Sequence, residues 1–443
     1  MLAKPKTENQ SSFFFTLEDT LSQKHPLYIL SNRVDWKLFD KEFSPLYCED
    51  NGRPAKPIRL MVGLLILKHI RNISDESVVE QWAENLYYQY FCGQQEFSSS
   101  EPCEASELVH FRKRIGEPGI ELILKESIRI NGDDSNDGQV SIDTTVQEKN
   151  ITFPTDAKLH KKIIKKCLAI AKKEQLSVRQ TYTRTLKKLG MDQRFRNHPR
   201  NKSKAKKADK KVKTIAGRLV RELERNLEPG SIHRTDIELF RQVLAQKRTS
   251  KNKIYSLHEP GTQCISKGKE HKKFEFGNKA SFVRTQNTGV IVGAMGFRNE
   301  FDGHTLEPVL EQTERLVGKA PKKAAFDRGY RGRNQIGETQ ILLPKPFNDK
   351  TQTKYQQKKL KEAHKKRAAI EPVIGHLKTD HRLGRNFYKG IVGDNINIML
   401  AAAGFNFKRM MNKWKLSYCQ FFQELFSLPE FATYKIFCLK RAF

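Results

Sequence analysis

The stretch Gln139-Val140-Ser141-Ile142-Asp143-Thr144-Thr145-Val146 decides how this sequence folds. Its alternating, β-branched pattern has the period of two that is typical of a β-strand. The strand follows a run of turn-forming residues at 131–138, which we interpret as a domain boundary. An acid inside such a strand costs stability unless it is paired or lies in a solvated cleft. Asp143 is therefore the first candidate for a functional side chain.

Strands and helices alternate downstream of this stretch. Strand patterns occur at 254–257, 273–276, 280–284, 290–297, 323–327 and 341–343, and helical patterns at 307–317, 361–377 and 395–410. Such interleaving predicts an α/β core over residues 136–410. The strand at 323–327 ends in Asp327, and the turn Arg328-Gly329-Tyr330 would lift that carboxylate to the edge of the sheet.

The first 135 residues predict an all-helical N-terminal domain. Leu60, Leu64 and Leu67 recur at helical spacing, and Ser74 is positioned to cap the helix that follows. Two interpretations stay open for the pair of helices that flank 72–74. They form a simple bundle core, or they form a helix-turn-helix that binds DNA.

The charge of the chain indicates a polyanionic partner. Its 443 residues carry 81 Lys and Arg against 50 Asp and Glu, a net charge of +31 with a pI near 9.8. Nucleic acid fits this excess better than an anionic membrane surface does. We see no apolar run long enough to span a bilayer, no secretory signal and no C-x-x-C among seven scattered cysteines. These features predict a cytoplasmic protein with reduced thiols, without a membrane partner or a zinc module.

More than half of the excess charge lies in one segment. Residues 158–213 hold 21 Lys and Arg against three acids, a net charge of +18. We expect a basic helical insertion at about 157–250 that interrupts the core and binds the DNA backbone. Its candidate contacts are Lys206, Lys207, Lys210 and Lys211. The aromatic-rich tail at 411–443 would cover the core or form an oligomer contact.

Three acids could support phosphodiester chemistry. Two Mg²⁺ ions stabilise the attacking and leaving oxygens of such a reaction, and carboxylates suit these hard cations. Asp143 and Asp327 stand at strand ends, where the alternative is a structural ion pair or an edge position. Glu371 would share one helical face with Arg367 and Lys378. An ordinary Arg367–Glu371 pair on a solvated helix is the alternative, and Pro372 predicts a local irregularity.

These motifs resemble a known family. The spacing His364-x-x-Arg367-x-x-x-Glu371, with Lys378 seven residues on, is similar to the tyrosine-arginine-glutamate-lysine signature of bacterial DDE-class insertion-sequence transposases. His364 stands where tyrosine is usual. Residues 141–145 and 325–330 resemble the first- and second-aspartate motifs of that class. Residues 52–93 with Phe111-Arg112 resemble the helical domain of the insertion-sequence-5 family.

The resemblance implies a ribonuclease-H-like core, which is a mixed sheet flanked by helices. It implies that Asp143, Asp327 and Glu371 are catalytic and bind two Mg²⁺ ions, for which Mn²⁺ can substitute. Arg367, Lys378 and the adjacent Arg328 would contact DNA. The implied partners are double-stranded DNA, as terminal inverted repeats and target, and further copies of the chain in a homodimer or larger assembly.

The resulting hypothesis is a nucleoid-associated DNA transposase that cleaves at inverted repeats and joins the freed 3′-hydroxyl ends to target DNA. Two other functions remain open. One is a catalytically inactive repressor from a decayed element, which would bind without cleaving. The other is a structure-specific nuclease on the same core, which would cleave without joining.

Overall fold

The computed structural model describes residues 16–48, 54–247, 249–266, 273–298, 300–327, 335–342 and 353–427. The chain divides into two compact units. The main unit comprises Met1–Gln147 and Lys279–Phe443, and the insertion unit comprises Glu148–Asn278. The two largest hydrophobic clusters of the described residues correspond to them, one for the N-terminal helices together with the sheet and one for the insertion, and a third small cluster lies among the first helices.

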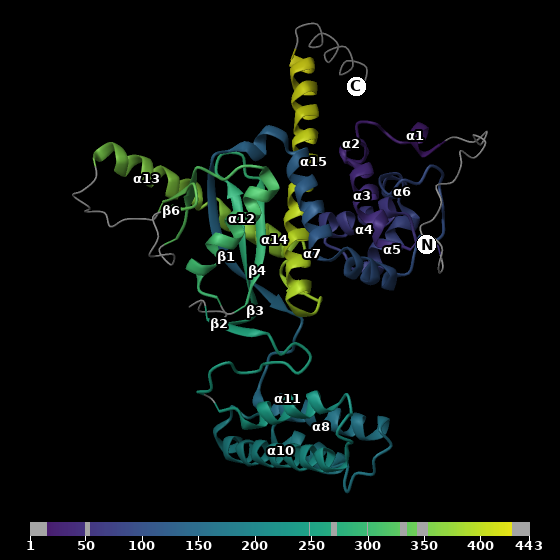
Figure 1. Cartoon of the computed structure of the whole chain (residues 1–443), viewed down its shortest axis with the longest axis vertical. Coiled ribbons are helices and arrows are strands. Elements are labelled where there is room, and N and C mark those ends of the chain that lie inside the picture. Colours follow the sequence, from purple (N-terminus) through teal and green to yellow (C-terminus); the bar gives the residue numbers. More distant parts are fainter. Residues whose placement is uncertain are drawn as a thin grey trace, which may run out of the picture. The chain divides into compact units, whose positions relative to one another are not determined.

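One mixed sheet runs through the described residues in the order β2-β3-β1-β5-β7-β6, with β4 paired to β3 and β8 to β1. The pairs β1–β5 and β5–β7 are parallel, whereas β2–β3, β3–β4 and β6–β7 are antiparallel. The strands are β1 Gln139–Lys149, β2 Gln263–Ser266, β3 Phe274–Thr285, β4 Ile291–Phe297, β5 Lys323–Ala325, β6 Gln335–Ile336, β7 Thr339–Leu342 and β8 Arg385–Asn386. Four helices accompany this sheet in the main unit (Figure 1): α12 Leu306–Val317, α13 Lys354–Arg367, α14 Ile370–Asp380 and α15 Gly390–Ser427.

The N-terminal region is all helical. Its α-helices are α1 Leu17–Thr20, α2 Pro26–Arg33, α3 Trp36–Phe43, α4 Ile58–Arg71, α5 Asp75–Glu84, α6 Leu86–Phe91 and α7 Ala105–Ile130. The Ser74 side chain caps α5 as predicted, because its oxygen accepts a hydrogen bond from the Ser77 amide at 3.1 Å.

The long helix α15, Gly390–Ser427, joins the N-terminal helices to the sheet. It packs along α7 and α4 on one side and along β4 on the other (Figure 1). Gly404 permits the close approach to α4, since a Cβ there would lie 2.9 Å from the His69 Cβ. The predicted helix at 395–410 is part of α15, which begins earlier and continues past residue 410 to Ser427.

Side chains from two helices occupy the edge of β4. Asn406 and Asn395 of α15 accept hydrogen bonds from the Ile291 and Gly296 amides, at 2.9 and 2.7 Å. Gln312 of α12, Leu306–Val317, accepts one from the Ala294 amide at 2.8 Å. An open strand edge is a site of unwanted pairing, so these bonds protect the sheet while they fix α15 to it.

A buried charge network holds the N-terminal helices together. Asp75 accepts hydrogen bonds from Lys68 Nζ at 2.7 Å and from both terminal nitrogens of Arg112 at 2.7 and 2.8 Å. Lys68 and Arg112 are only 2% and 4% exposed. Burial lowers the pKa of Lys68 to about 7. Burial would raise the pKa of Asp75, but Arg112 and Lys68 bring it down to about 2.

This network is continuous with the segment after α14, Ile370–Asp380. Lys68 Nζ also donates to the Tyr388 hydroxyl at 2.8 Å, and the Arg112 guanidinium stacks over the Tyr388 ring at 4.5 Å. Asn72, left-handed at the end of α4, donates to the Thr379 carbonyl at 2.6 Å. The N-terminal helices thus support the end of α14.

The insertion unit contains four α-helices within its described residues. They are α8 Asp156–Lys173, α9 Thr183–Asp192, α10 Pro199–Asn226 and α11 Arg234–Ala245, and α8 and α11 both pack against α10 (Figure 1). The near-continuous charge run at 197–213 lies mostly within α10. Ala205, Ala208 and Val212 recur there at helical spacing and are buried, so small side chains between the lysines give α10 its apolar stripe.

Several predicted elements differ from the structure. Residues 254–257 form no strand, because Gln246 hydrogen bonds to both the amide and the carbonyl of Ile254. The two predicted strands at 273–276 and 280–284 are one continuous strand, β3. The strand at 323–327 ends at Ala325, two residues before the acid.

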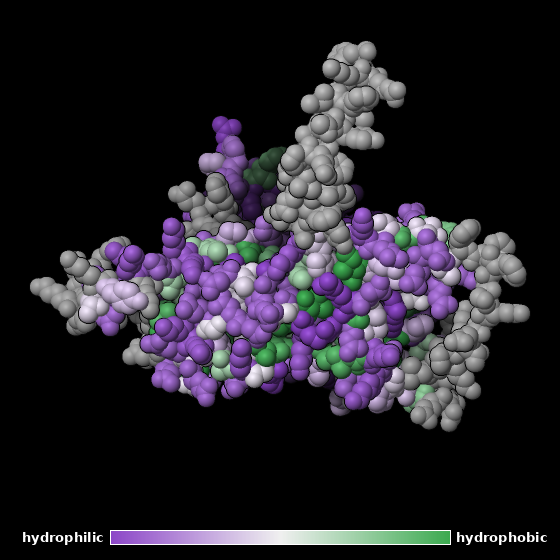
Figure 2. Space-filling view, turned by 90° about the horizontal axis from the view of Figure 1, so that it is seen from above, coloured by the Kyte–Doolittle hydropathy of each residue, from purple (hydrophilic) through white to green (hydrophobic). Residues whose placement is uncertain are grey.

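The predicted fold class is confirmed: an α/β core with a mixed sheet flanked by helices, an all-helical N-terminal region and a helical basic insertion. Among the described residues, no helix is both long and apolar enough to cross a membrane. The face seen in Figure 2 is mostly hydrophilic, and its hydrophobic residues form only small, separate patches.

Removing the central acid of the buried network should be strongly destabilising. Asp75→Ala would leave the Lys68 and Arg112 charges buried without their partner, which costs about 3–5 kcal/mol of unfolding free energy. Chemical denaturation of the full chain measures this loss. Glu80→Ala, on the exposed face of the same helix, is the control and should change stability by less than about 0.5 kcal/mol. Equal effects from the two variants would contradict the assignment.

Candidate active site

The register of two parallel strands relates Asp143 to Asp327. The last paired positions of β1 and β5 are Ser141 and Ala325, and each aspartate lies two residues further along its strand direction. Paired parallel strands lie about 4.8 Å apart, and residues two apart point to the same face. Both aspartates therefore lie two residues past the last paired positions, Asp143 inside β1 and Asp327 just after the end of β5. Asp143 is 21% exposed in its side chain, and Asp327 is exposed.

The helix α13, Lys354–Arg367, lies over the face of β1 that carries Asp143. Buried Gln286 establishes this placement, since its amide nitrogen donates to Ser141 Oγ at 3.2 Å and to the Ala363 carbonyl at 3.3 Å. Ser141 and Asp143 share a face of β1. A second contact fixes the same helix, because Lys366 Nζ donates to Asn287 Oδ1 at 2.7 Å.

Arg367, the last residue of α13, stands between two of the predicted acids. Its guanidinium lies 3.8 Å from Asp143 Oδ2 and 3.8 Å from Glu371 Oε1. The Arg367 side chain is 14% exposed and that of Glu371 is 65% exposed. One cation therefore joins a carboxylate of the sheet to a carboxylate of α14.

The single helix predicted at 361–377 is wrong, and Pro372 explains the break. The structure ends α13 at Arg367 and begins α14 at Ile370. Pro372 has no amide hydrogen to donate to the Ala368 carbonyl, and its ring would clash with that group in a continuous helix. Pro372 falls instead in the first turn of α14, where proline is tolerated. Arg367 and Glu371 thus belong to different helices, although the predicted pair between them is present.

The structure brings Arg367 together with Asp143 and Glu371, but it does not place the other predicted DNA contacts in one cluster. Lys378 lies on α14, two turns after Glu371, and is partly exposed. Arg328 lies outside the described residues, as do the side chains of the tail from residue 416 onward. Lys206, Lys207, Lys210 and Lys211 are exposed on α10 of the insertion unit.

The helix-turn-helix interpretation of 72–74 finds little support in this geometry. The second helix of such a motif reads bases with its N-terminal residues. In α5 those residues are Asp75, which is held by Lys68 and Arg112, and Glu76, which is exposed and acidic. Negative charge at that point would repel phosphate. The bundle-core interpretation agrees better with the buried Val78, Val79 and Trp82.

The donor set suits a divalent cation. Asp143 and Glu371 already share one positive group, and carboxylate oxygens are the ligands that Mg²⁺ and Mn²⁺ prefer. Within the described part of the chain, however, no three His, Cys, Asp or Glu side chains are grouped closely enough to hold a metal ion. Bound metal would require the Arg367 guanidinium to give up its place between the two carboxylates.

Two site residues escaped the sequence analysis. Gln286 and Asn287 follow β3 and attach α13 to the sheet, and Asn287 is itself fixed by Asp137, which accepts from its amide at 2.7 Å. Both are common surface residue types in a turn, so nothing in the local sequence marks them. Their role depends on contacts more than 70 residues away along the chain.

Comparison with known proteins gives two family matches and one similar protein. Residues 15–114 match a family described as a transposase domain, and residues 311–411 match a family described as a transposase DDE domain. The chain is also similar to an uncharacterized protein, ORF8 in the nfe locus of Rhizobium meliloti, with 37% identity over 203 residues. That similarity covers 45% of this chain and 98% of the relative. No solved structure matches the chain.

Arg367→Gln should strengthen the binding of a divalent cation to the DNA-free protein. A unit charge about 4 Å away is worth ~1 kcal/mol in water, so removing the competing guanidinium should increase Mn²⁺ affinity about fivefold for each carboxylate it contacts. Isothermal titration calorimetry measures this change. Lys365→Gln removes an exposed charge from the same helix and should leave the affinity nearly unchanged. Unchanged or weaker binding in Arg367→Gln would refute the competition.

Proposed function

Because this chain belongs to the DDE-class insertion-sequence transposases, we propose that it cleaves DNA at terminal inverted repeats and joins the freed 3′-hydroxyl ends to target DNA. Asp143, Asp327 and Glu371 are the proposed catalytic and metal-binding residues, with two Mg²⁺ ions as cofactors and Mn²⁺ as a substitute.

One observation carries the proposal more than any other. Asp143 and Asp327 each follow the last paired residue of neighbouring parallel strands by two positions, and Arg367 joins Asp143 to Glu371. These relations place three acids that are far apart in the sequence toward one end of the sheet, although in the described residues they are not grouped closely enough to hold a metal ion. Carboxylates held in this way by rigid elements are what metal-assisted phosphoryl transfer requires.

The two proposed steps exchange phosphorus–oxygen bonds. In cleavage, a water oxygen bonds to phosphorus while the bond to the 3′ oxygen breaks, which leaves a free 3′-hydroxyl. In joining, that hydroxyl oxygen bonds to a target phosphorus and displaces another 3′ oxygen, so the number of phosphodiester bonds is conserved and no energy source is needed. Divalent cations, when bound, would activate the attacking oxygen and stabilise the leaving one.

Several basic side chains have proposed roles in positioning DNA. Arg367 holds Glu371 beside Asp143 before the site is loaded, and afterwards its guanidinium is free to contact a phosphate. Lys378, two turns after Glu371, would contact a phosphate near the scissile bond, and Arg328 would do so beside Asp327. Lys206, Lys207, Lys210 and Lys211 would bind the backbone of flanking or target DNA.

The remaining assignments concern organisation. We propose that residues 1–135 bind the transposon end and that 136–410 form the catalytic domain around the insertion at about 157–250. The predicted tail at 411–443 begins inside α15, and Met411 and Trp414 are buried in the main core. The protein would act as a homodimer or larger assembly on DNA, because two ends must be joined together. A DNA substrate would keep it at the bacterial nucleoid.

A strand-transfer assay with Mg²⁺ and a DNA end tests the catalytic assignment. Asp327→Ala should reduce joining by at least 10²-fold, the scale expected when a charged group that acts in the transition state is lost. The same variant should still bind the DNA end in EDTA, because Asp327 is exposed and its proposed role requires the divalent cation that EDTA removes. Binding in EDTA therefore serves as the control for folding.

The products distinguish this proposal from its rivals. Undiminished joining by Asp327→Ala would overturn the assignment of that residue. Cleavage without joining by the wild-type chain would indicate a nuclease, and binding without either reaction in Mg²⁺ or Mn²⁺ would indicate an inactive DNA-binding protein.

A further inference from the structure

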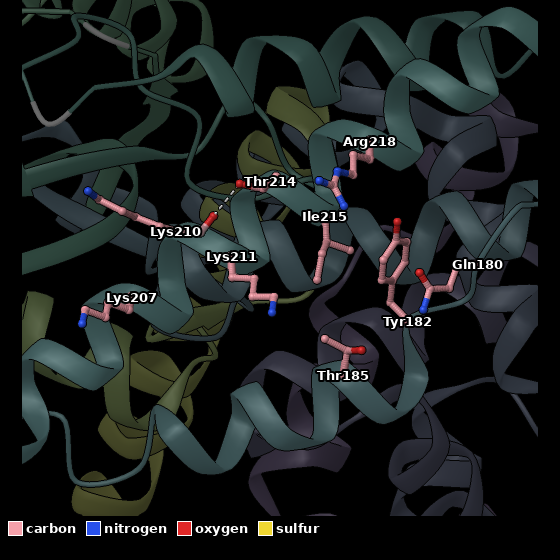
Figure 3. A pocket seen from close by; sticks show the side chains of 9 residues that line it. All are labelled: Gln180, Tyr182, Thr185, Lys207, Lys210, Lys211, Thr214, Ile215 and Arg218. Carbon is pink, nitrogen blue, oxygen red and sulfur yellow. Dashed lines mark hydrogen bonds between the residues drawn. The ribbon is translucent and has the colours of Figure 1, made fainter.

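A basic groove lies between α9 and α10 of the insertion unit (Figure 3). It encloses about 500 Å³ and is lined by four cationic side chains, all from α10. These are Lys207, Lys210, Lys211 and Arg218. No acid is present in the lining, so the groove concentrates positive charge around one hollow.

Three of the four acids on these two helices are ion-paired with cations outside the groove, and the fourth, Glu222 of α10, accepts a hydrogen bond from the Arg179 amide. Asp192 pairs with Lys204 at 3.0 Å, and Asp209 pairs with Arg196. Glu224 pairs with Arg241 at 3.0 Å. The four groove cations, by contrast, form no ion pair within the described residues. Most of the nearby acids are therefore neutralised by cations outside the groove, and the four groove cations remain for an external anion.

The groove also offers neutral hydrogen-bond donors. Gln180, Tyr182 and Thr185 line it from the α9 side. In Figure 3 the Tyr182 ring and Arg218 lie at one end, Lys207 and Lys210 lie at the other, and Lys211 is between them. Tyr182 adopts a left-handed backbone conformation with φ of 58°, which is strained for a bulky residue. Amide and hydroxyl donors interspersed with cations are typical contacts to phosphate oxygens.

The row of cations matches a run of phosphates. Lys207 and Arg218 are eleven residues apart, which is about 16 Å along a helix with a rise of 1.5 Å per residue. One DNA strand advances about 3.4 Å per nucleotide, so this length corresponds to four or five nucleotides. Contacts to phosphate oxygens carry no sequence information, so a row of cations along one backbone binds any base sequence.

We infer that the α9–α10 groove binds consecutive backbone phosphates of one DNA strand, independently of base sequence. DNA is chosen as the polyanion because of the proposed function, whereas the site itself rests on the charge and geometry of the insertion unit. Lys206, which the sequence analysis grouped with its neighbours, is not among the lining residues. Three of the four candidate lysines therefore line the groove, together with Arg218.

The salt dependence of DNA binding by the full chain tests this inference. The probe is a 30-base-pair duplex of arbitrary sequence, in EDTA, with binding followed by fluorescence anisotropy from about 0.1 to 0.4 M salt. Each lost phosphate contact lowers the steepness of log affinity against log salt by about 0.9. Over a tenfold change in salt, the affinity then changes by a factor that is roughly eightfold smaller. Lys207→Gln/Lys211→Gln should therefore reduce the slope by about 1.8.

The matched control is Lys202→Gln/Lys213→Gln, which removes the same charge from exposed positions of α10 outside the groove. It should leave the slope nearly unchanged, and a second duplex of unrelated sequence should give the same result for both variants. Equal losses in the two double variants would show diffuse attraction and overturn the groove. An unchanged slope in Lys207→Gln/Lys211→Gln would also overturn it, as would a loss seen with only one duplex sequence.

This test is independent of catalysis. It uses no divalent cation, so a chain that failed to join DNA could still show the groove effect. Conversely, Asp327→Ala could lose joining as expected while Lys207→Gln/Lys211→Gln leaves the salt slope unchanged. That result would support the catalytic proposal and overturn only the groove.

Discussion

The parallel pairing of β1 with β5 is the constraint on which the rest of the candidate site depends. These two strands lie more than 170 residues apart in the sequence, yet Gln139 to Ser141 pair in register with Lys323 to Ala325. A shift of one residue would turn one aspartate to the opposite face of the sheet. Both faces of the pair are buried here, and a slip of one residue in β1 would exchange the large Val140 and Ile142 for the small, polar Ser141 in the tightly packed core.

Two different sets of contacts hold α13 and α14 next to the β1–β5 pair. Gln286 ties α13 to Ser141 through neutral hydrogen bonds, and Arg367 then reaches the carboxylates from the end of that helix. The N-terminal helices hold α14 and the segment after it. Asn72 binds the last turn of α14, and the Lys68–Asp75–Arg112 network contacts Tyr388. Buried charge is costly, and it is tolerated there because every member of the network has a partner.

Local sequence patterns predicted most helices and strands, but they failed where contacts between distant segments decide the structure. Ser74 as a helix cap, the helix at 307–317 and the strand at 290–297 follow from local rules, and the structure agrees within a residue or two. The break between Arg367 and Ile370 was indicated by Pro372, although its position was not fixed by the pattern. The charge run in α10 was harder to interpret, because its buried side chains are mostly alanines and look neutral beside so many lysines.

The sequence by itself determined the basic character of the chain, the alternation of its strands and helices, and the order of the three acids with their signature spacing. These are properties of composition and of local periodicity, and they need no partner segment. Only the tertiary structure decided which residues meet. It set the register of β1 with β5, the place of Arg367 between two carboxylates, and which of the neighbouring lysines line the α9–α10 groove. The physical reason is that strand register and helix packing are fixed by burial between distant segments, which no local pattern encodes.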